Sequence, residues 1–138
     1  MSTQTASLRF FGKIHDETVR LAMATRDYLT HANPGAAPGL SPMDGLRLNC
    51  ECLRLTSRLA HAMAWILAQK AQQAGEISLG SLGGTQYQLA GQAVCLNEGE
   101  TDAALLPKRL LELLEASRLL YVRVARLDEL VRRAGSAA

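Results

Sequence analysis

The fold of this 138-residue chain is decided by residues 41–75, which read SPMDGLRLNCECLRLTSRLAHAMAWILAQKAQQAG. Ser41 is a favourable N-cap residue, Pro42 suits the first helical position, and Asp44 lies where a capping-box carboxylate would. Gly75 is the residue type that most often follows the last turn of a helix. These signals predict one long helix over residues 42–74, a rod of roughly 50 Å.

Two apolar stripes follow this predicted helix. The first recurs in alternating steps of three and four residues and consists of Met43, Leu46, Cys50, Leu53, Ser57, Ala60, Ala64, Leu67, Ala71 and Ala74. The second lies on another face and consists of Leu48, Cys52, Leu55, Leu59, Met63 and Ile66. A surface helix normally has one apolar face, so a helix with two is expected to be buried between neighbours. We therefore predict an all-α protein, an antiparallel three-helix bundle with this helix at its centre.

Composition agrees with this fold class. Aromatic residues make up only 4% of the chain, and the abundance of Ala and Leu favours helix–helix packing over a β sandwich. The length suits one domain over residues 1–138. No apolar stretch reaches the roughly 18 residues of a membrane span, and the N-terminus lacks the apolar segment of a signal peptide. We therefore expect a cytoplasmic protein that does not enter the membrane.

Two further helices are expected beside the central one. The first covers residues 7–30 and ends before Asn33-Pro34-Gly35. The last covers residues 102–133, with Thr101 or Asp102 as its cap and Pro107 in its first turn, where proline is tolerated. Its apolar positions keep a four–three step through Leu106, Leu110, Leu113, Ser117, Leu120, Val124, Leu127 and Val131.

The connection over residues 76–101 is long and rich in glycine. Alternating apolar residues around Gly83-Gly84 would fit a small hairpin, but two isolated strands are only marginally stable. We interpret the segment as a loop that lies over the bundle and contacts apolar surface through Tyr87, Leu89, Val94 and Leu96.

The sequence contains no constellation typical of an enzyme. The three histidines are not spaced as metal ligands, and a helical Cys50-Glu51-Cys52 directs its thiols about 200° apart. The glycine-rich Gly80–Gly84 lacks the Lys-Ser/Thr of a phosphate-binding loop. We predict no catalytic residue, no cofactor and no metal, and we expect all three cysteines to be reduced.

Two polar patterns remain to be weighed. Arg54 and Arg58 share a face of the central helix, with Arg47 and Glu51 one or two turns earlier. If the second and third helices are antiparallel, Arg47 and Glu51 come near the ion-pairing residues Arg126, Asp128 and Glu129. Alternatively, the arginines form a docking patch for another protein. The third helix also carries seven basic residues, but its interleaved acids and the net charge of +2 disfavour nucleic acid as the main partner.

Several segments of the chain together resemble the RcdA family, the regulators of CtrA degradation. In the central helix these are LRLTSRL at 53–59, AWILAQKA at 64–71 and GEIS at 75–78. In the third helix they are Leu106-Pro107, LLELLEAS at 110–117 and RVARLD at 123–128. The similarity extends from the first helix to about Val131 and consists of many ordinary residues in order.

The resemblance implies a non-enzymatic adaptor. Family members are small three-helix proteins that dimerise and help deliver cell-cycle regulators to the ClpXP protease. They act with a response-regulator primer of the ClpX unfoldase and with a cyclic-di-GMP-binding effector protein that recruits CtrA as cargo, in part at the cell pole. The sequence ends at Ala138 without the long tail of the studied type of member. If that tail contributes to delivery, this protein would keep the scaffold and bind a different set of partners.

The resulting functional hypothesis has one alternative. We expect an adaptor that forms a homodimer through apolar surface on the first or third helix and contacts other proteins around Arg54, Arg58 and Gln69. The alternative is a helical regulatory protein that binds DNA or another transcriptional regulator through the basic residues of the third helix. Salt dependence separates the two, because phosphate contacts weaken steeply as salt rises.

Overall fold

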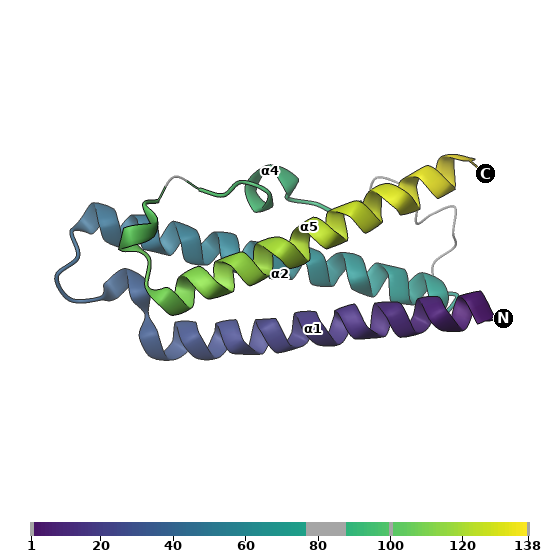
Figure 1. Ribbon diagram of the computed structural model, residues 1–138, viewed down its shortest axis with the longest axis horizontal. Helices are drawn as coiled ribbons and strands as arrows, with labels where there is room; N and C mark the ends of the chain where they lie inside the picture. Colours follow the sequence, from purple (N-terminus) through teal and green to yellow (C-terminus); the bar gives the residue numbers. More distant parts are fainter. Residues whose placement is uncertain (1, 77–87, 100, 138) are drawn as a thin grey trace.

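The computed structural model describes residues 2–76, 88–99 and 101–137 as an all-α protein (Figure 1). Its three main helices are α1 (Ser2–Ala32), α2 (Pro42–Gln73) and α5 (Lys108–Ala137). Three short elements lie between them, the 3-10 turn η1 (Pro34–Ala36), the single turn α4 (Gln92–Cys95) and the 3-10 turn η3 (Ala103–Leu105). The predicted bundle of three helices is confirmed, and the described residues include no strand.

The start and stop signals of α2 act as the sequence predicts. The Ser41 hydroxyl accepts a hydrogen bond from the Asp44 backbone N–H at 3.1 Å, and Asp44 pairs with Arg47 at 2.9 Å. Gly75 has a φ of 81°, the left-handed conformation that ends a helix without steric cost in glycine.

The predicted boundaries of the third helix are wrong at both ends, because it starts at Lys108 instead of residue 102 and extends to Ala137 instead of residue 133. Asp102 caps a separate 3-10 turn, where its carboxylate accepts from the Ala104 N–H at 3.0 Å. Leu106 is extended, as the residue before a proline favours. The first turn of α5 is then closed by the Leu111 N–H and the Pro107 carbonyl.

The three helices do not all alternate in direction. α1 runs opposite to α2 and α5, whereas α2 and α5 run the same way (Figure 1). Side-chain contacts confirm this, because Arg58 binds the Leu114 carbonyl and Trp65, two turns later, binds Asp128. The expected network between Arg47 or Glu51 and the late residues of α5 is therefore wrong.

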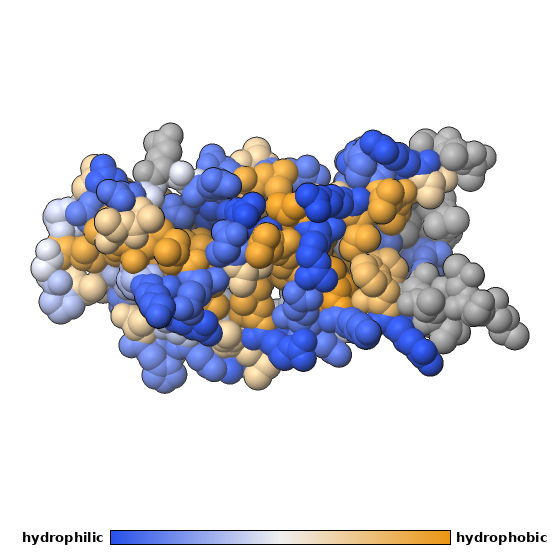
Figure 2. Space-filling view, viewed as in Figure 1, coloured by the Kyte–Doolittle hydropathy of each residue, from blue (hydrophilic) through white to orange (hydrophobic). Residues whose placement is uncertain are grey.

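Parallel α2 and α5 require the chain to return along the length of the bundle before α5 begins. The described part of this return, residues 88–99 and 101–107, is called the strap below. Figure 1 shows it beside α2 and α5, with α4 near the middle of the bundle. On the face drawn in Figure 2, polar residues separate the apolar ones into several patches.

The second apolar stripe of α2 is buried, and the first is not. Leu48, Leu55 and Ile66 are at most 2% exposed and form the core with α1 and α5. The prediction that the bundle also buries the first stripe is wrong, since Leu53 is 66% exposed and Leu46 is 56% exposed. The neighbours of α2 cover one side of this helix and leave its back uncovered. This first stripe is called the outer seam below, and its members are Met43, Leu46, Cys50, Leu53, Ser57, Ala60, Ala64, Leu67, Ala71 and Ala74.

Trp65 is the chain's one tryptophan and joins all three main helices. It is 3% exposed, meets Phe11 of α1 edge-on at 6.1 Å, and donates its indole N–H to Asp128 of α5 at 3.1 Å. Its burial confirms the expectation from the sequence.

Replacing Trp65 with alanine should lower the free energy of unfolding by about 3–5 kcal/mol, because a large cavity forms and Asp128 loses its donor. Urea unfolding followed by circular dichroism measures the change. Leu130→Ala is the matched control, since Leu130 is 60% exposed, and should change stability by about 0.5 kcal/mol or less. Equal effects of the two substitutions would contradict the placement of Trp65.

Candidate functional site

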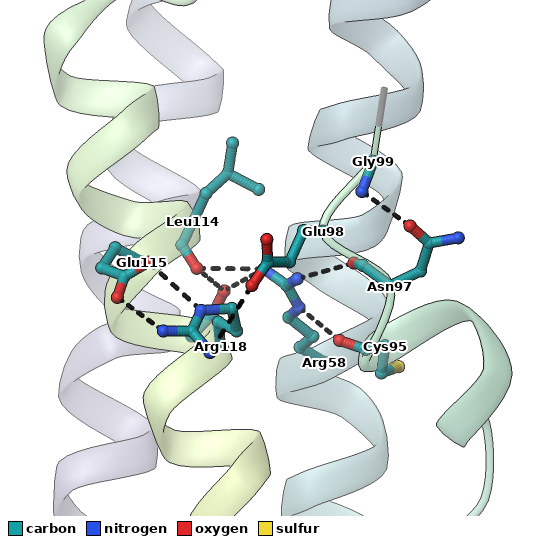
Figure 3. Close-up of polar contacts among 9 residues, drawn as sticks. Arg58, Cys95, Asn97, Glu98, Gly99, Leu114, Glu115 and Arg118 are labelled. Carbon is teal, nitrogen blue, oxygen red and sulfur yellow. Dashed lines mark hydrogen bonds and ion pairs between the residues drawn. The ribbon is translucent and has the colours of Figure 1, made fainter. Parts of the chain in front are cut away.

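The densest polar cluster of the described residues surrounds Arg58, which lies where α2, the strap and α5 meet (Figure 3). Its Nε donates to the Cys95 carbonyl at 2.8 Å and its Nη2 to the Asn97 carbonyl at 3.0 Å. Its Nη1 donates to the Leu114 carbonyl at 3.0 Å and to the Ser117 hydroxyl at 3.3 Å. One planar guanidinium thus binds two carbonyls of the strap and one turn of α5.

The positive charge of Arg58 is stabilised mainly by these oxygen acceptors. The side chain is buried, with 2% of the residue exposed. Burial, and next to it the charge of Arg54, lowers the pKa of Arg58 from its ordinary value. An arginine remains protonated under such conditions, because its pKa starts above about 12. The buried charge is therefore a fixed structural element.

A second contact holds the strap two turns before Arg58 on α2, at Glu51. The Glu51 carboxylate is nearly buried, pairs with Arg54 at 2.7 Å and accepts from the Thr101 hydroxyl at 3.0 Å. Gly99 lies against this pair with a φ of 79°. A Cβ at that position would come within 2.5 Å of both Arg54 Nη1 and Glu51 Oε1. The positive φ favours glycine here, and any larger residue would also have to displace the ends of the Arg54 and Glu51 side chains.

The other end of the strap is held by Tyr121 of α5. Its hydroxyl donates to the Ala90 carbonyl at 2.6 Å, and the residue has no exposed surface. Burial, with a smaller contribution from Cys95, raises the pKa of Tyr121 above its ordinary value. Burial likewise raises the pKa of the Cys95 thiol, which is fully buried and therefore protonated and unreactive at neutral pH.

The strap differs in part from the predicted loop. Leu89 is 5% exposed and packs in the core, as expected. Val94 and Leu96 are 53% and 41% exposed, so neither joins the core as Leu89 does. Cys95, between them, is the residue that points inward, because the turn of α4 places only one of these three side chains against the bundle. The predicted contact of Tyr87 and the possible hairpin lie outside the described residues.

A depression of about 230 Å³ lies beside the Arg58 cluster, where the strap meets α5. Its lining includes Glu51, Arg58, Glu98, Glu115 and Arg118. Arg118 pairs with Glu115 at 2.8 Å and lies 4.0 Å from Glu98. Ligand pockets of drug-sized molecules start at about 300 Å³ and are mostly apolar, so this small, charged depression resembles the edge of an ion-pair network more than a ligand site.

The three predicted interaction residues have different environments. Arg58 and Gln69 are 2% and 3% exposed, and the Arg54 side chain is 15% exposed. The contacts of Arg58 and Arg54 account for both as structural residues. Protein docking at Arg54, Arg58 and Gln69 stays a prediction, and the burial of Arg58 and Gln69 leaves little of either side chain for a partner to reach.

Sequence reasoning missed Glu51, Tyr121 and Asp128 as parts of the polar interior. Glu51 and Asp128 are 4% and 2% exposed. A signal for Glu51 was present, because it lies within the arc of the second apolar stripe, three residues after Leu48 and four before Leu55. A charged residue on such a buried arc indicates an internal partner. The partner, Thr101, lies 50 residues away, and no local pattern indicates it.

Two further findings concern metal ligands and membrane-spanning helices. The described residues include no group of three or more His, Cys, Asp or Glu side chains that could hold a metal ion. Among the described helices, none combines the length and the apolar character needed to cross a bilayer.

Fold and contacts together define a helical-bundle protein whose buried polar groups fasten a returning strap. The chain belongs to the family described as "Protein of unknown function (DUF1465)", which matches residues 2–138. No curated protein and no solved structure matches the chain.

Removing the Arg58 guanidinium should release the strap. In Arg58→Met, four hydrogen bonds are lost, and buried carbonyls left without a donor cost about 1–3 kcal/mol each, so we expect a loss of at least about 2 kcal/mol. Amide hydrogen exchange at residues 92–97 should accelerate more than that in α1. Arg58→Lys should also release the strap, since one ammonium group cannot reproduce the planar arrangement of donors of a guanidinium. Arg47→Met, at an exposed position, is the control, and equal exchange in both variants would contradict the role of Arg58.

Tyr121 should give the protein a specific alkaline sensitivity. Its raised pKa means that the folded protein retains the phenol proton after the unfolded chain has lost it. The stabilisation is complete below about pH 10, the ordinary tyrosine pKa, and is lost as the pH rises above that value. Unfolding measured between about pH 9 and pH 11 should show a steeper loss of stability in the wild type than in Tyr121→Phe. Equal slopes would show that Tyr121 ionises as freely in the folded protein as in the unfolded chain.

Proposed function

We propose that this protein is a non-enzymatic adaptor that helps deliver cell-cycle regulators to a ClpXP-type protease. Its proposed partners are a second copy of itself, a ClpX-type unfoldase with a response-regulator primer, a cyclic-di-GMP effector protein and a CtrA-like cargo. The proposed location is the cytoplasm, with recruitment to the cell pole. The basis is the resemblance to the RcdA family, and membership in the DUF1465 family is compatible with it.

Contacts between the segments that resemble the RcdA family support this proposal. Two of the segments that carry the resemblance, residues 64–71 of α2 and 123–128 of α5, meet through the hydrogen bond from Trp65 to Asp128. Arg58, in the similar segment 53–59, binds Leu114 and Ser117 in the similar segment 110–117. Four of the segments behind the resemblance are thus joined in pairs between α2 and α5. Such pairing supports a shared scaffold, and an adaptor acts through the surfaces of its scaffold.

The polar interior is also consistent with a binding protein. Arg58, Glu51, Trp65 and Tyr121 are all engaged by groups of the same chain. Buried polar groups used in this way hold a structure together and are not presented to a substrate. The outer surfaces of the bundle are left as the places where partners would bind.

The alternative, binding of DNA or a transcriptional regulator through α5, has weaker support. Its basic residues are largely neutralised by neighbouring acids. The ion pairs are Arg109 with Glu112, Arg118 with Glu115, Arg123 with Glu17, Arg132 with Asp128 and Glu129, and Arg133 with Glu129. A surface that binds phosphates presents a continuous positive field, and this pairing interrupts it.

Reconstituted proteolysis tests the adaptor directly. The reaction contains ClpX-type unfoldase, peptidase, primer, cyclic-di-GMP effector and a CtrA-like cargo, with or without this protein. We expect faster loss of the cargo when the protein is present. Heat-denatured protein serves as the unfolded control and should not accelerate the reaction. Unchanged cargo turnover, together with no binding to unfoldase, primer or effector, would contradict the proposal.

A matched pair of variants then tests the predicted interaction residues. Arg54→Glu reverses the charge of the one predicted side chain that has appreciable exposure, and Arg54→Lys preserves it. If Arg54 contacts a partner, Arg54→Glu should stay folded by circular dichroism and lose stimulation, whereas Arg54→Lys should keep it. Loss of the fold in Arg54→Glu would assign Arg54 to the scaffold alone.

A further inference from the structure

The outer seam of α2 is a mostly apolar stripe without a charged residue. Met43 and Leu46 are each 56% exposed, Leu53 is 66% and Leu67 is 50% exposed. The remaining members are Cys, Ser and Ala, and none of the ten positions carries Asp, Glu, Lys or Arg. The charged residues that are near in sequence point elsewhere, as Glu51 and Arg54 do toward the strap.

A seam of this length needs a partner to explain it. Single exposed leucines are common and need no explanation, but the back of a surface helix is ordinarily polar. The seam keeps the three–four step of a heptad from Met43 to Ala74. Apolar heptads sustained over three or four repeats indicate a coiled-coil contact with another helix. At 1.5 Å per residue the seam is about 47 Å long.

We infer that the outer seam is the interface of a homodimer, in which α2 packs antiparallel against α2 of a second copy. This inference names the contact of the homodimer included in the proposed function and replaces the first or third helix, which the sequence suggested. Its test reads the oligomeric state, so its failure and the failure of the adaptor proposal are distinguishable.

The sizes of the seam residues indicate that the partner of the seam is a second copy of the same chain. A two-fold axis between Arg58 and Leu59 places each seam residue opposite another one of the second copy. The layers are Met43 with Ala74, Leu46 with Ala71, Cys50 with Leu67, Leu53 with Ala64, and Ser57 with Ala60. In four of the five layers a Met or Leu side chain faces a smaller Ala or Cys side chain, and the fifth layer joins the two small residues Ser57 and Ala60. The surface is therefore complementary to itself, as a two-fold interface requires.

A parallel pairing lacks this complementarity. It would place Leu46 on Leu46 and Leu53 on Leu53 in the first half of the seam, and Ala64 on Ala64 and Ala71 on Ala71 in the second. The first half would be crowded and the second would leave gaps, and gaps in an apolar contact are destabilising. Antiparallel packing distributes the bulk evenly along both helices.

The flanks of the seam agree with the antiparallel register. On one flank Arg47 would lie near Ala68 of the second copy, and Arg54 near His61. On the other, Asn49 would lie near Lys70 and Thr56 near Met63. None of these four contacts joins two Lys or Arg residues or two acidic residues, and Arg54 already pairs with Glu51 in its own chain.

Sedimentation equilibrium at tens of micromolar tests the seam. The wild type should give twice the chain mass of 14.9 kDa. Leu53→Glu and Ala64→Lys, each at an exposed position, should shift the protein to the monomer without loss of helix by circular dichroism. Leu119→Glu, at a 50% exposed position of α5, is the matched control and should remain dimeric. A monomeric wild type, or a dimer disrupted by Leu119→Glu and not by Leu53→Glu, would overturn the inference.

The double variant Leu53→Glu/Ala64→Lys tests the orientation. In the antiparallel register each introduced carboxylate faces an introduced ammonium of the second copy, so the dimer should return. In a parallel register like charges would face each other, and the double variant would stay monomeric. Failure of the double variant to dimerise, when both single variants are folded monomers, would overturn the antiparallel arrangement.

Discussion

The structure depends on the contact of one buried guanidinium with two carbonyls of the strap and one turn of α5. α2 and α5 run in the same direction, so the chain between them must travel back along the bundle. A backbone segment laid across a helical surface has carbonyls that no neighbouring strand can satisfy. Arg58 satisfies the Cys95 and Asn97 carbonyls and holds α5 through Leu114 at the same time. Arginine suits this task because its donors are fixed in a plane.

The other polar contacts of the interior extend this arrangement along the bundle. Tyr121 binds the strap at Ala90, Arg58 binds it just after α4, and Glu51 binds it further along at Thr101. Because these contacts and α1 all lie on one side of α2, the back of that helix receives no cover from its own chain. The same topology that fastens the strap therefore leaves the outer seam exposed, and the adaptor and homodimer proposals both concern surfaces that this topology leaves available.

Much of the fold could be predicted from local patterns, and the rest depended on long-range contacts. Caps and periodicity predicted α2 to within one residue because Ser41 and Gly75 act within a few residues of the chain. The start of α5 was misplaced because Asp102 caps a different turn, and the direction of α5 was misjudged because nothing local distinguishes a short turn from a long return. The outer seam was visible as a stripe, but periodicity cannot say whether the partner of a stripe belongs to the same chain. For the candidate site, the pairing of Arg58 with Cys95 and Asn97 joins residues far apart in sequence, so only the folded structure reveals it.

Parallel alignment of α2 and α5 is the central claim, and the single tryptophan allows a direct test by NMR. The indole N–H of Trp65, near the end of α2, should show nuclear Overhauser effects to Asp128, near the end of α5. In an antiparallel arrangement it would lie instead beside the early residues of α5, such as Leu110 and Leu113. Effects to the Asp128 side chain and none to those leucines would agree with the structure. Effects to Leu110 or Leu113, with none to Asp128, would contradict it.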